Sequence, residues 1–102
     1  MRKYKVTKEE RDVIKKYQNY SIPFTFKAGK FLGYMQYFEY IDFEICYILL
    51  KGKAISEKNY DFIFHNMPDE QEIEKQLDDY AKEFYNCYLE IKRIVKKYYM
   101  LN

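Results

Sequence analysis

Hydrophobic residues recur at spacings of three and four along much of this chain, which is the period of an α-helix with one apolar face. The clearest run extends from Asp69 to Leu101 and contains no Gly or Pro. Asp69 and Glu72 have the spacing of a capping box, in which the first side chain caps the helix and the second bonds back to it. The pattern therefore predicts one long C-terminal helix. Its main apolar positions are Ile73, Leu77, Tyr80, Phe84, Cys87, Ile91, Ile94 and Tyr98.

A second capping box, formed by Thr7 and Glu10, predicts an N-terminal helix that runs to about Tyr20. We expect this helix to end just before Pro23, because the residue that precedes a proline avoids the helical region. Apolar residues then alternate with other residues over positions 22–26. That alternation predicts an extended segment.

Residues 30–51 fit two patterns at once. At 100° per residue, eight apolar side chains fall on one arc of a helix, and Gly52 would then end that helix in the left-handed conformation. The same stretch alternates apolar residues with Asp42 and Glu44, as a half-buried strand does, and its Tyr, Phe and Ile content favours strands. No turn signal divides the stretch, and a strand of about twenty residues would be unusually long. Helix is therefore the favoured interpretation.

Together the patterns predict an all-α fold, in which residues 1–102 form a single domain: a small helical bundle with a long C-terminal helix. We expect Ser56 to cap a short third helix that runs from Glu57 to about Asn66. The alternative is an α+β fold, with a short aromatic-rich antiparallel sheet over residues 22–64 packed by the N- and C-terminal helices. The C-terminal helix would span about 50 Å, more than a compact domain of this size. We therefore expect a homodimer or a docked partner along this helix.

The aromatic content gives a separate reason to expect a binding surface. Thirteen residues are Tyr and eight are Phe among 102. A small core needs few rings, so many would lie near the surface, where the Tyr ring packs while its hydroxyl stays hydrated. Exposed aromatic side chains anchor protein interfaces. We assign to partner binding two stripes that lie off the predicted core arcs: Tyr40, Phe43 and Tyr47, and Tyr85, Leu89 and Tyr99.

The net charge of +2 indicates no partner by itself, but the charges are unevenly distributed. Residues 1–30 carry nine basic and three acidic side chains, and residues 84–102 carry four and one, while the middle of the chain is acidic. Cations interleaved with aromatic rings would neutralise phosphates while the rings stack on bases. An alternative, nucleic-acid-binding site therefore comprises Lys92, Arg93, Lys96 and Lys97 with Arg2 and Lys3 of the N-terminal arm.

No residue pattern points to catalysis, to a metal or to a cofactor. Cys46, His65 and Cys87 lack the spacing of a zinc site, and the three glycines form no phosphate-binding loop. Two distant cysteines fit the reducing cytoplasm. No apolar leader follows Met1, and acidic residues interrupt the apolar stretch 31–50. The sequence therefore predicts neither a signal peptide nor a transmembrane span.

The function that fits these observations is non-enzymatic: a small cytoplasmic protein that acts by binding another protein. The rich use of Lys, Ile, Tyr and Asn indicates an AT-rich genome. Small aromatic-rich chains without a catalytic set are common among phage- and plasmid-encoded accessory proteins. The hypothesis is therefore an inhibitor or regulator of a host protein machine, such as a defence nuclease or a polymerase. The alternative is a nucleic-acid-binding protein.

Overall fold

The computed structural model describes residues 4–27, 35–75 and 79–100, and these residues form helices joined by short connections, with no β-strand among them. The predicted all-α fold is confirmed, and the alternative sheet over residues 22–64 has no support in the described part of that range. The elements are α1 (Lys8–Lys27), α2 (Met35–Tyr40), the π-helix η2 (Ile41–Ile45), α3 (Cys46–Lys51), α4 (Glu57–Asp61), the π-helix η3 (Phe62–Asn66), α5 (Glu70–Lys75) and α6 (Asp79–Tyr99).

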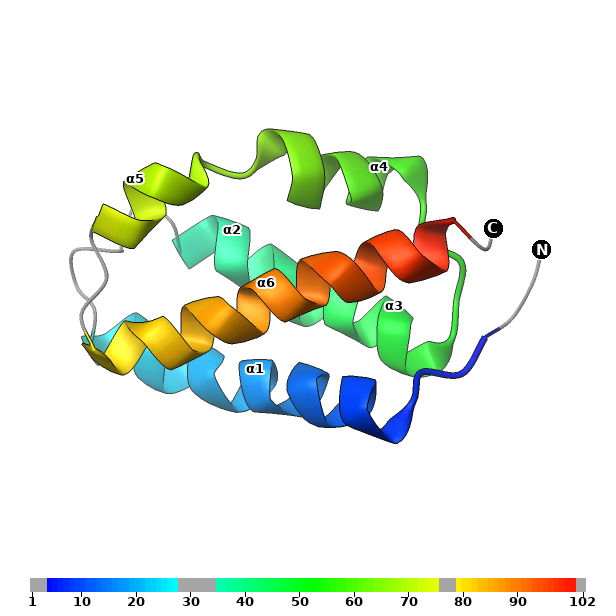
Figure 1. The fold of residues 1–102 in the computed structure, drawn as a ribbon, viewed down its shortest axis with the longest axis horizontal. Helices are drawn as coiled ribbons and strands as arrows, with labels where there is room; N and C mark the ends of the chain where they lie inside the picture. The colour runs from blue at the N-terminus through cyan, green and yellow to red at the C-terminus, as the bar shows by residue number, and fades with distance from the viewer. Residues whose placement is uncertain (1–3, 28–34, 76–78, 101–102) are drawn as a thin grey trace.

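The helices pack in a flat bundle around α6 (Figure 1). In this view α6 crosses the centre, α1 lies along one side of it, α4 and α5 lie along the other, and the helix α2–η2–α3 lies behind it. The start of α1 and the end of α6 lie at the same end of the molecule. The principal dimensions are 40 × 26 × 18 Å, so the body is about two helix diameters thick.

Side-chain caps fix where three of the helices begin. The Thr7 N–H donates to the Glu10 carboxylate at 2.8 Å, and the Glu10 N–H donates to Thr7 Oγ1 at 3.1 Å. Ser56 Oγ accepts from the Asn59 N–H at 3.1 Å. Asp69 Oδ1 accepts from the backbone N–H two residues later at 2.9 Å. The caps predicted at Thr7, Ser56 and Asp69 are therefore confirmed, and the box of Thr7 and Glu10 shows both of its bonds.

The end of α1 differs from the prediction. The helix continues through Pro23 to Lys27, so the extended segment predicted over residues 22–26 is wrong. A proline inside a helix removes one N–H donor and costs about 3 kcal/mol. However, α1 packs along α6, and most helical stability in proteins comes from such tertiary packing rather than from local propensity.

The ambiguous middle of the chain is a helix over its described residues 35–51. Its inner face carries Phe38, Ile41, Ile45 and Leu49, each at most 5% exposed. Gly52 ends the helix in the left-handed conformation, with φ of 68°, as predicted. The N-terminal segment crosses the chain at this point. A Cβ atom at position 52 would lie 2.1 Å from the carbonyl oxygen of Tyr4. The glycine therefore allows both the turn and the close approach.

The predicted long C-terminal helix is confirmed in α6, but α5 precedes it as a separate helix, so the prediction of one continuous helix over residues 69–101 is wrong. Lys92 Nζ lies 2.5 Å from Glu70 Oε1, whereas 22 residues of continuous helix would separate these positions by about 33 Å. The chain therefore reverses between α5 and α6 (Figure 1). The reversal buries Ile73 completely. Leu77 and Tyr80, two other positions of the predicted apolar seam, lie outside the residues whose side chains are described.

The length of α6 gives no reason to expect a second copy of the chain. Its 21 residues span about 31 Å, which fits within the 40 Å long axis of the body. The expectation that the helix projects or dimerises depended on a length of about 50 Å, and the reversal removes that premise.

Ring contacts join α1, the middle helix and α6 in the core. The Tyr17 ring meets the Phe84 ring edge to face at 4.9 Å. The Phe38 ring contacts Phe84 at 5.1 Å and Tyr88 at 5.6 Å, also edge to face. Such pairs contribute about 0.5–1.5 kcal/mol beyond the area they bury. The fully buried Tyr17 hydroxyl donates to the Phe38 carbonyl oxygen at 2.8 Å, so this polar group is satisfied inside the core.

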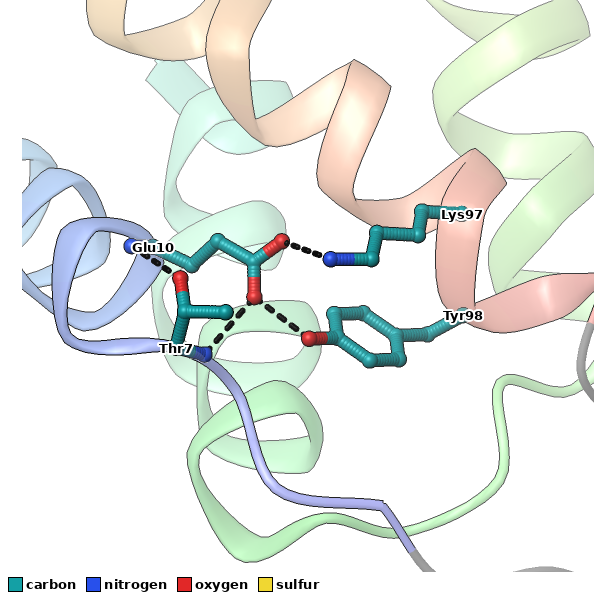
Figure 2. Close-up of polar contacts among 4 residues, drawn as sticks. All are labelled: Thr7, Glu10, Lys97 and Tyr98. Carbon is teal, nitrogen blue, oxygen red and sulfur yellow. Dashed lines mark hydrogen bonds and ion pairs between the residues drawn. The ribbon is translucent and has the colours of Figure 1, made fainter.

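Glu10 fastens the start of α1 to the end of α6 (Figure 2). Besides the cap bond from Thr7, its carboxylate accepts from Lys97 Nζ at 2.8 Å and from the Tyr98 hydroxyl. The Tyr98 ring also stacks on Tyr4, with the ring centroids 4.2 Å apart. Burial raises the pKa of Glu10, but the hydrogen bonds from these three donors outweigh it and hold the pKa below its usual value. One residue therefore caps a helix and clamps two helices together.

We expect Gly52→Ala to lower the free energy of unfolding by about 2 kcal/mol or more. A left-handed alanine costs about 1–2 kcal/mol, and the carbonyl group of Tyr4 must also move away from the new Cβ atom. Urea unfolding followed by circular dichroism measures the change. Lys58→Ala, at an exposed position of α4, is the control and should shift stability by less than about 0.5 kcal/mol. An unchanged midpoint for Gly52→Ala would contradict the close approach.

We expect Glu10→Gln to cost about 1–2 kcal/mol at neutral pH, because it keeps a cap acceptor but removes the charge that Lys97 and Tyr98 bind. The folded-state pKa of Glu10 lies below the ordinary value of 4.5. The advantage of the wild type is therefore fully present above that value and is lost as the pH falls through the folded-state pKa. Urea titrations from about pH 7 to pH 3 should show the two stabilities converging in acid. A stability difference between the wild type and Glu10→Gln that stayed constant with pH would contradict the clamp. The control is Glu9→Gln, at an exposed neighbouring position, whose stability should not converge with that of the wild type in acid.

Candidate functional site

Among the residues whose side chains the structure describes, the middle helix carries the only exposed aromatic rings. Phe43 is 70% exposed and Tyr47 is 49% exposed. They are four residues apart on the outer side of the helix. Lys51 Nζ and Lys53 Nζ lie 5.6 and 5.4 Å from the centroid of the Tyr47 ring. Phe43 and Tyr47 are called the aromatic patch below; both belong to the stripe predicted to bind a partner.

Tyr40, the third member of that stripe, packs within the fold. Its hydroxyl donates to Asn59 Oδ1 at 2.5 Å, and its ring centroid lies 4.2 Å from that of Phe62. Asn59 is itself buried. Tyr40 therefore links the middle helix to α4 and η3 rather than standing free for a partner.

The second predicted stripe, on the C-terminal helix, is largely covered by the same chain. Tyr85 is 5% exposed and donates to the backbone carbonyl of Glu70 at 3.4 Å, and burial raises its pKa to about 12. Tyr99 stacks on Tyr60 of α4, with the centroids 4.2 Å apart. Leu89 is half-buried. The layer formed by α4, η3 and α5 lies along this side of α6 (Figure 1), because the chain reverses before α6.

Three of the four basic residues of α6 predicted to contact nucleic acid have acidic partners. Lys96 is exposed and forms no ion pair with the described residues. Arg2 and Lys3, the predicted N-terminal arm, lie outside the described residues. The carboxylates lower the positive potential that α6 presents to a polyanion. The pairs are Lys92 with Glu70 at 2.5 Å, Arg93 with Glu90, and Lys97 with Glu10 at 2.8 Å.

A groove lies between α6 and the segment η3–α5, and it contains four of the predicted binding residues. Its volume is about 480 Å³. Phe64 and Leu89 supply half-buried apolar surface, and cations of α6 stand beside them. The lining of this basic groove, as it is called below, consists of Phe64, Glu70, Leu89, Lys92, Arg93 and Lys96.

Lys92 is held in a fixed position in the basic groove. Its side chain is only 18% exposed. Its Nζ lies 5.3 Å from the Phe64 ring centroid and 5.7 Å from the Tyr88 ring centroid, which is the range of cation–π attraction. Two rings and the Glu70 carboxylate therefore hold this ammonium group in place. Arg93, by contrast, is 73% exposed.

A smaller hollow of about 280 Å³ adjoins the basic groove and shares Phe64, Glu70 and Lys92 with it. Tyr88 lines this hollow and is fully buried, yet its hydroxyl has no hydrogen-bond partner among the described residues. Burial raises the pKa of Tyr88, and the nearby Glu70 carboxylate raises it further. A buried donor without a partner costs about 1–3 kcal/mol. Binding of a ligand whose acceptor atom reached this hydroxyl would therefore be favoured.

The remaining reactive side chains are buried or paired. Cys46 and Cys87 are buried free thiols, and burial raises the pKa of each, which keeps them protonated. His65 is exposed, and its Nδ1 lies 3.1 Å from Asp61 Oδ1 one helical turn away. In the described ranges, no three metal-ligating side chains gather into a cluster. None of the described helices has both the length and the apolar character needed to cross a membrane.

Sequence reasoning missed Phe64 and Glu70 as parts of a groove. Phe64 falls in a stretch that fits helix or strand, and Glu70 reads only as an acidic residue in the first turn of a long helix. The available signal was the apolar surface of the C-terminal helix on two sides. Tyr85 and Leu89 lie off the main seam, and in a short chain the segment just upstream is the nearest cover for them.

Comparison of this chain with protein-family models, with curated proteins and with solved structures finds no match. The functional proposals therefore rest on the aromatic patch and on the basic groove.

Proposed function

We propose that this is a small, non-enzymatic protein-binding protein whose aromatic patch contacts the partner. The observation that carries the proposal is the exposure of Phe43 and Tyr47 in a chain whose other described rings are buried or half-buried. Leaving a phenylalanine side chain in water forgoes about 1.5–3 kcal/mol relative to burying it. A pocket on a partner would recover that free energy, and aromatic anchors of this kind dominate binding at protein interfaces.

The surroundings of the patch favour a partner with an acidic surface. Lys51 and Lys53 flank Tyr47, and such charges accelerate the encounter with an oppositely charged protein. The residue usage supports a phage- or plasmid-encoded inhibitor or regulator of a host machine, such as a defence nuclease or a polymerase. Such a protein would act by covering a surface of its target in the cytoplasm, where the two thiols stay reduced. A second copy of the chain is a further candidate, because two aromatic patches could bury each other across a two-fold axis.

We expect Phe43→Ser combined with Tyr47→Ser to abolish partner binding while leaving the fold intact, since both side chains are exposed. Each interface anchor contributes about 2 kcal/mol or more, which is a loss of about 30-fold in affinity per ring. The measurement is quantitative proteomics on the tagged protein in its own host cells. Interferometry with each purified candidate partner then gives the affinity.

The matched control replaces Lys15 and Asn19 by Ser, two exposed residues of α1 that are also four positions apart. Light scattering of each purified variant separates the possible partners. A dimer that dissociates only when the aromatic patch is replaced would make the chain its own partner. Recovery of the same partners, with unchanged affinity, by the patch variant would refute the proposal.

Nucleic-acid binding is the second candidate, and the observation that favours it is the exposed Lys96 beside Arg93 and Lys92 in the basic groove. Glu70 and Glu90 weigh against it, because each already neutralises one of these cations. A nucleic-acid strand would have to displace both carboxylates or tolerate their repulsion.

Arg93→Glu combined with Lys96→Glu tests this second candidate without touching the pairs of Lys92 and Lys97. If nucleic acid is the partner, the variant should bind labelled single-stranded DNA or RNA far more weakly. The magnitude of its salt slope should also fall by about 1.4, since two phosphate contacts to a single strand are lost. Anisotropy titrations at several salt concentrations measure both quantities. Wild-type protein that shows no salt-dependent binding would end this candidate.

A further inference from the structure

We propose that the basic groove binds a short acidic peptide segment of a partner protein. One apolar side chain of the peptide would pack on Phe64 and Leu89, and its carboxylates would pair with Arg93 and Lys96. This inference rests on protein binding as the function, and it adds the chemistry of the partner and a second contact surface, distinct from the aromatic patch.

The shape of the groove suits a side chain with a short stretch of backbone. Its volume of about 480 Å³ lies within the range of ligand-binding clefts. Phe64 and Leu89 come from opposite sides, η3 and α6, and both keep part of their apolar surface accessible. An apolar residue of a peptide laid between the two elements would therefore contact both.

The charges of the groove suit carboxylates. Lys96 is exposed and forms no ion pair with described residues. The pair between Arg93 and Glu90 is 73% and 45% exposed, and an exposed pair of this kind contributes only about 0–1 kcal/mol. Arg93 can therefore exchange its neighbour for a peptide carboxylate at little cost. Lys92 is held by two rings and by Glu70, which balances its charge, so the attraction for peptide carboxylates comes from Arg93 and Lys96.

A peptide fits this arrangement better than a nucleic-acid strand does. Glu70 and Glu90 stand among the cations, and they would repel a backbone that carries a charge on every nucleotide. A peptide can place neutral residues opposite these carboxylates and acidic residues opposite Lys96. Base stacking would need a whole open ring face, whereas Lys92 lies over the Phe64 ring and Tyr60 stacks on it with the centroids 4.6 Å apart. An aliphatic side chain needs only the part of this half-buried ring that stays accessible.

The adjoining hollow offers one more polar anchor. Tyr88 lines this hollow, and its fully buried hydroxyl has no hydrogen-bond partner among the described residues. A backbone carbonyl or carboxylate oxygen of the peptide that entered the hollow would accept from this hydroxyl if a small shift of the ring turned it toward the hollow. A buried donor of this kind favours ligands that carry an acceptor over those that do not.

The test is selection of binders from a displayed library of random twelve-residue peptides. Three proteins are immobilised: the wild type, the double variant Arg93→Glu/Lys96→Glu, and the double variant Phe43→Ser/Tyr47→Ser. Lys8→Glu with Lys15→Glu, at exposed positions of α1, is the charge-matched control. Circular dichroism verifies that all variants remain folded. Enriched peptides are then synthesised with a fluorophore, and their affinities are measured by anisotropy.

We expect the enriched peptides to combine Asp or Glu with a large apolar residue. Their affinity for the Arg93/Lys96 variant should be about tenfold or more lower than for the wild type. Their affinity for the control should equal that for the wild type. Enrichment without acidic residues, or equal binding to the Arg93/Lys96 variant, would overturn the proposal. Tighter binding of a twelve-nucleotide single strand at the same residues would reassign the groove to nucleic acid. Peptides that depend only on Phe43 and Tyr47 would remove the groove from the account and leave the proposed function standing.

Discussion

The presence of apolar surface on two sides of α6 is the constraint on which the rest of the structure depends. One side meets α1 and the middle helix through Phe84 and its neighbours. The other side, which carries Tyr85 and Tyr99, needs separate cover. The chain provides that cover by reversing before α6, so that α4, η3 and α5 lie against it and Glu70 reaches Lys92. The same reversal creates the basic groove, which lies on the seam between the covering layer and the helix.

The high tyrosine content serves packing before it serves binding. A body about two helices thick leaves most side chains near a surface, and tyrosine suits such positions because its ring packs while its hydroxyl finds an acceptor. Tyr98 shows both uses, since it stacks on Tyr4 and donates to Glu10. Composition alone therefore overestimates how many rings are available to a partner. Two described rings, those of Phe43 and Tyr47, are exposed, and this small number is what makes them informative.

Local signals made much of the helical fold predictable. The cap at Thr7, the cap at Ser56 and the left-handed Gly52 depend on neighbouring residues, and each is found where the sequence places it. The continuation of α1 through Pro23 and the reversal before α6 depend on what packs against the helices, which no local pattern encodes. The candidate site follows the same division: the cations of α6 are visible in the sequence, whereas the acids that neutralise them come partly from distant segments.

A soluble paramagnetic agent tests directly which aromatic rings the fold encloses. Nuclear magnetic resonance would measure the relaxation that the agent induces at each assigned aromatic ring in the free protein. We expect strong enhancement at Phe43 and Tyr47 and weak enhancement at Tyr85, Tyr88 and Tyr99. Enhancement at Tyr85 and Tyr99 as strong as at Tyr47 would mean that the second side of α6 is open. That result would contradict the reversal, the groove that depends on it, and the choice of Phe43 and Tyr47 as the aromatic surface left for a partner.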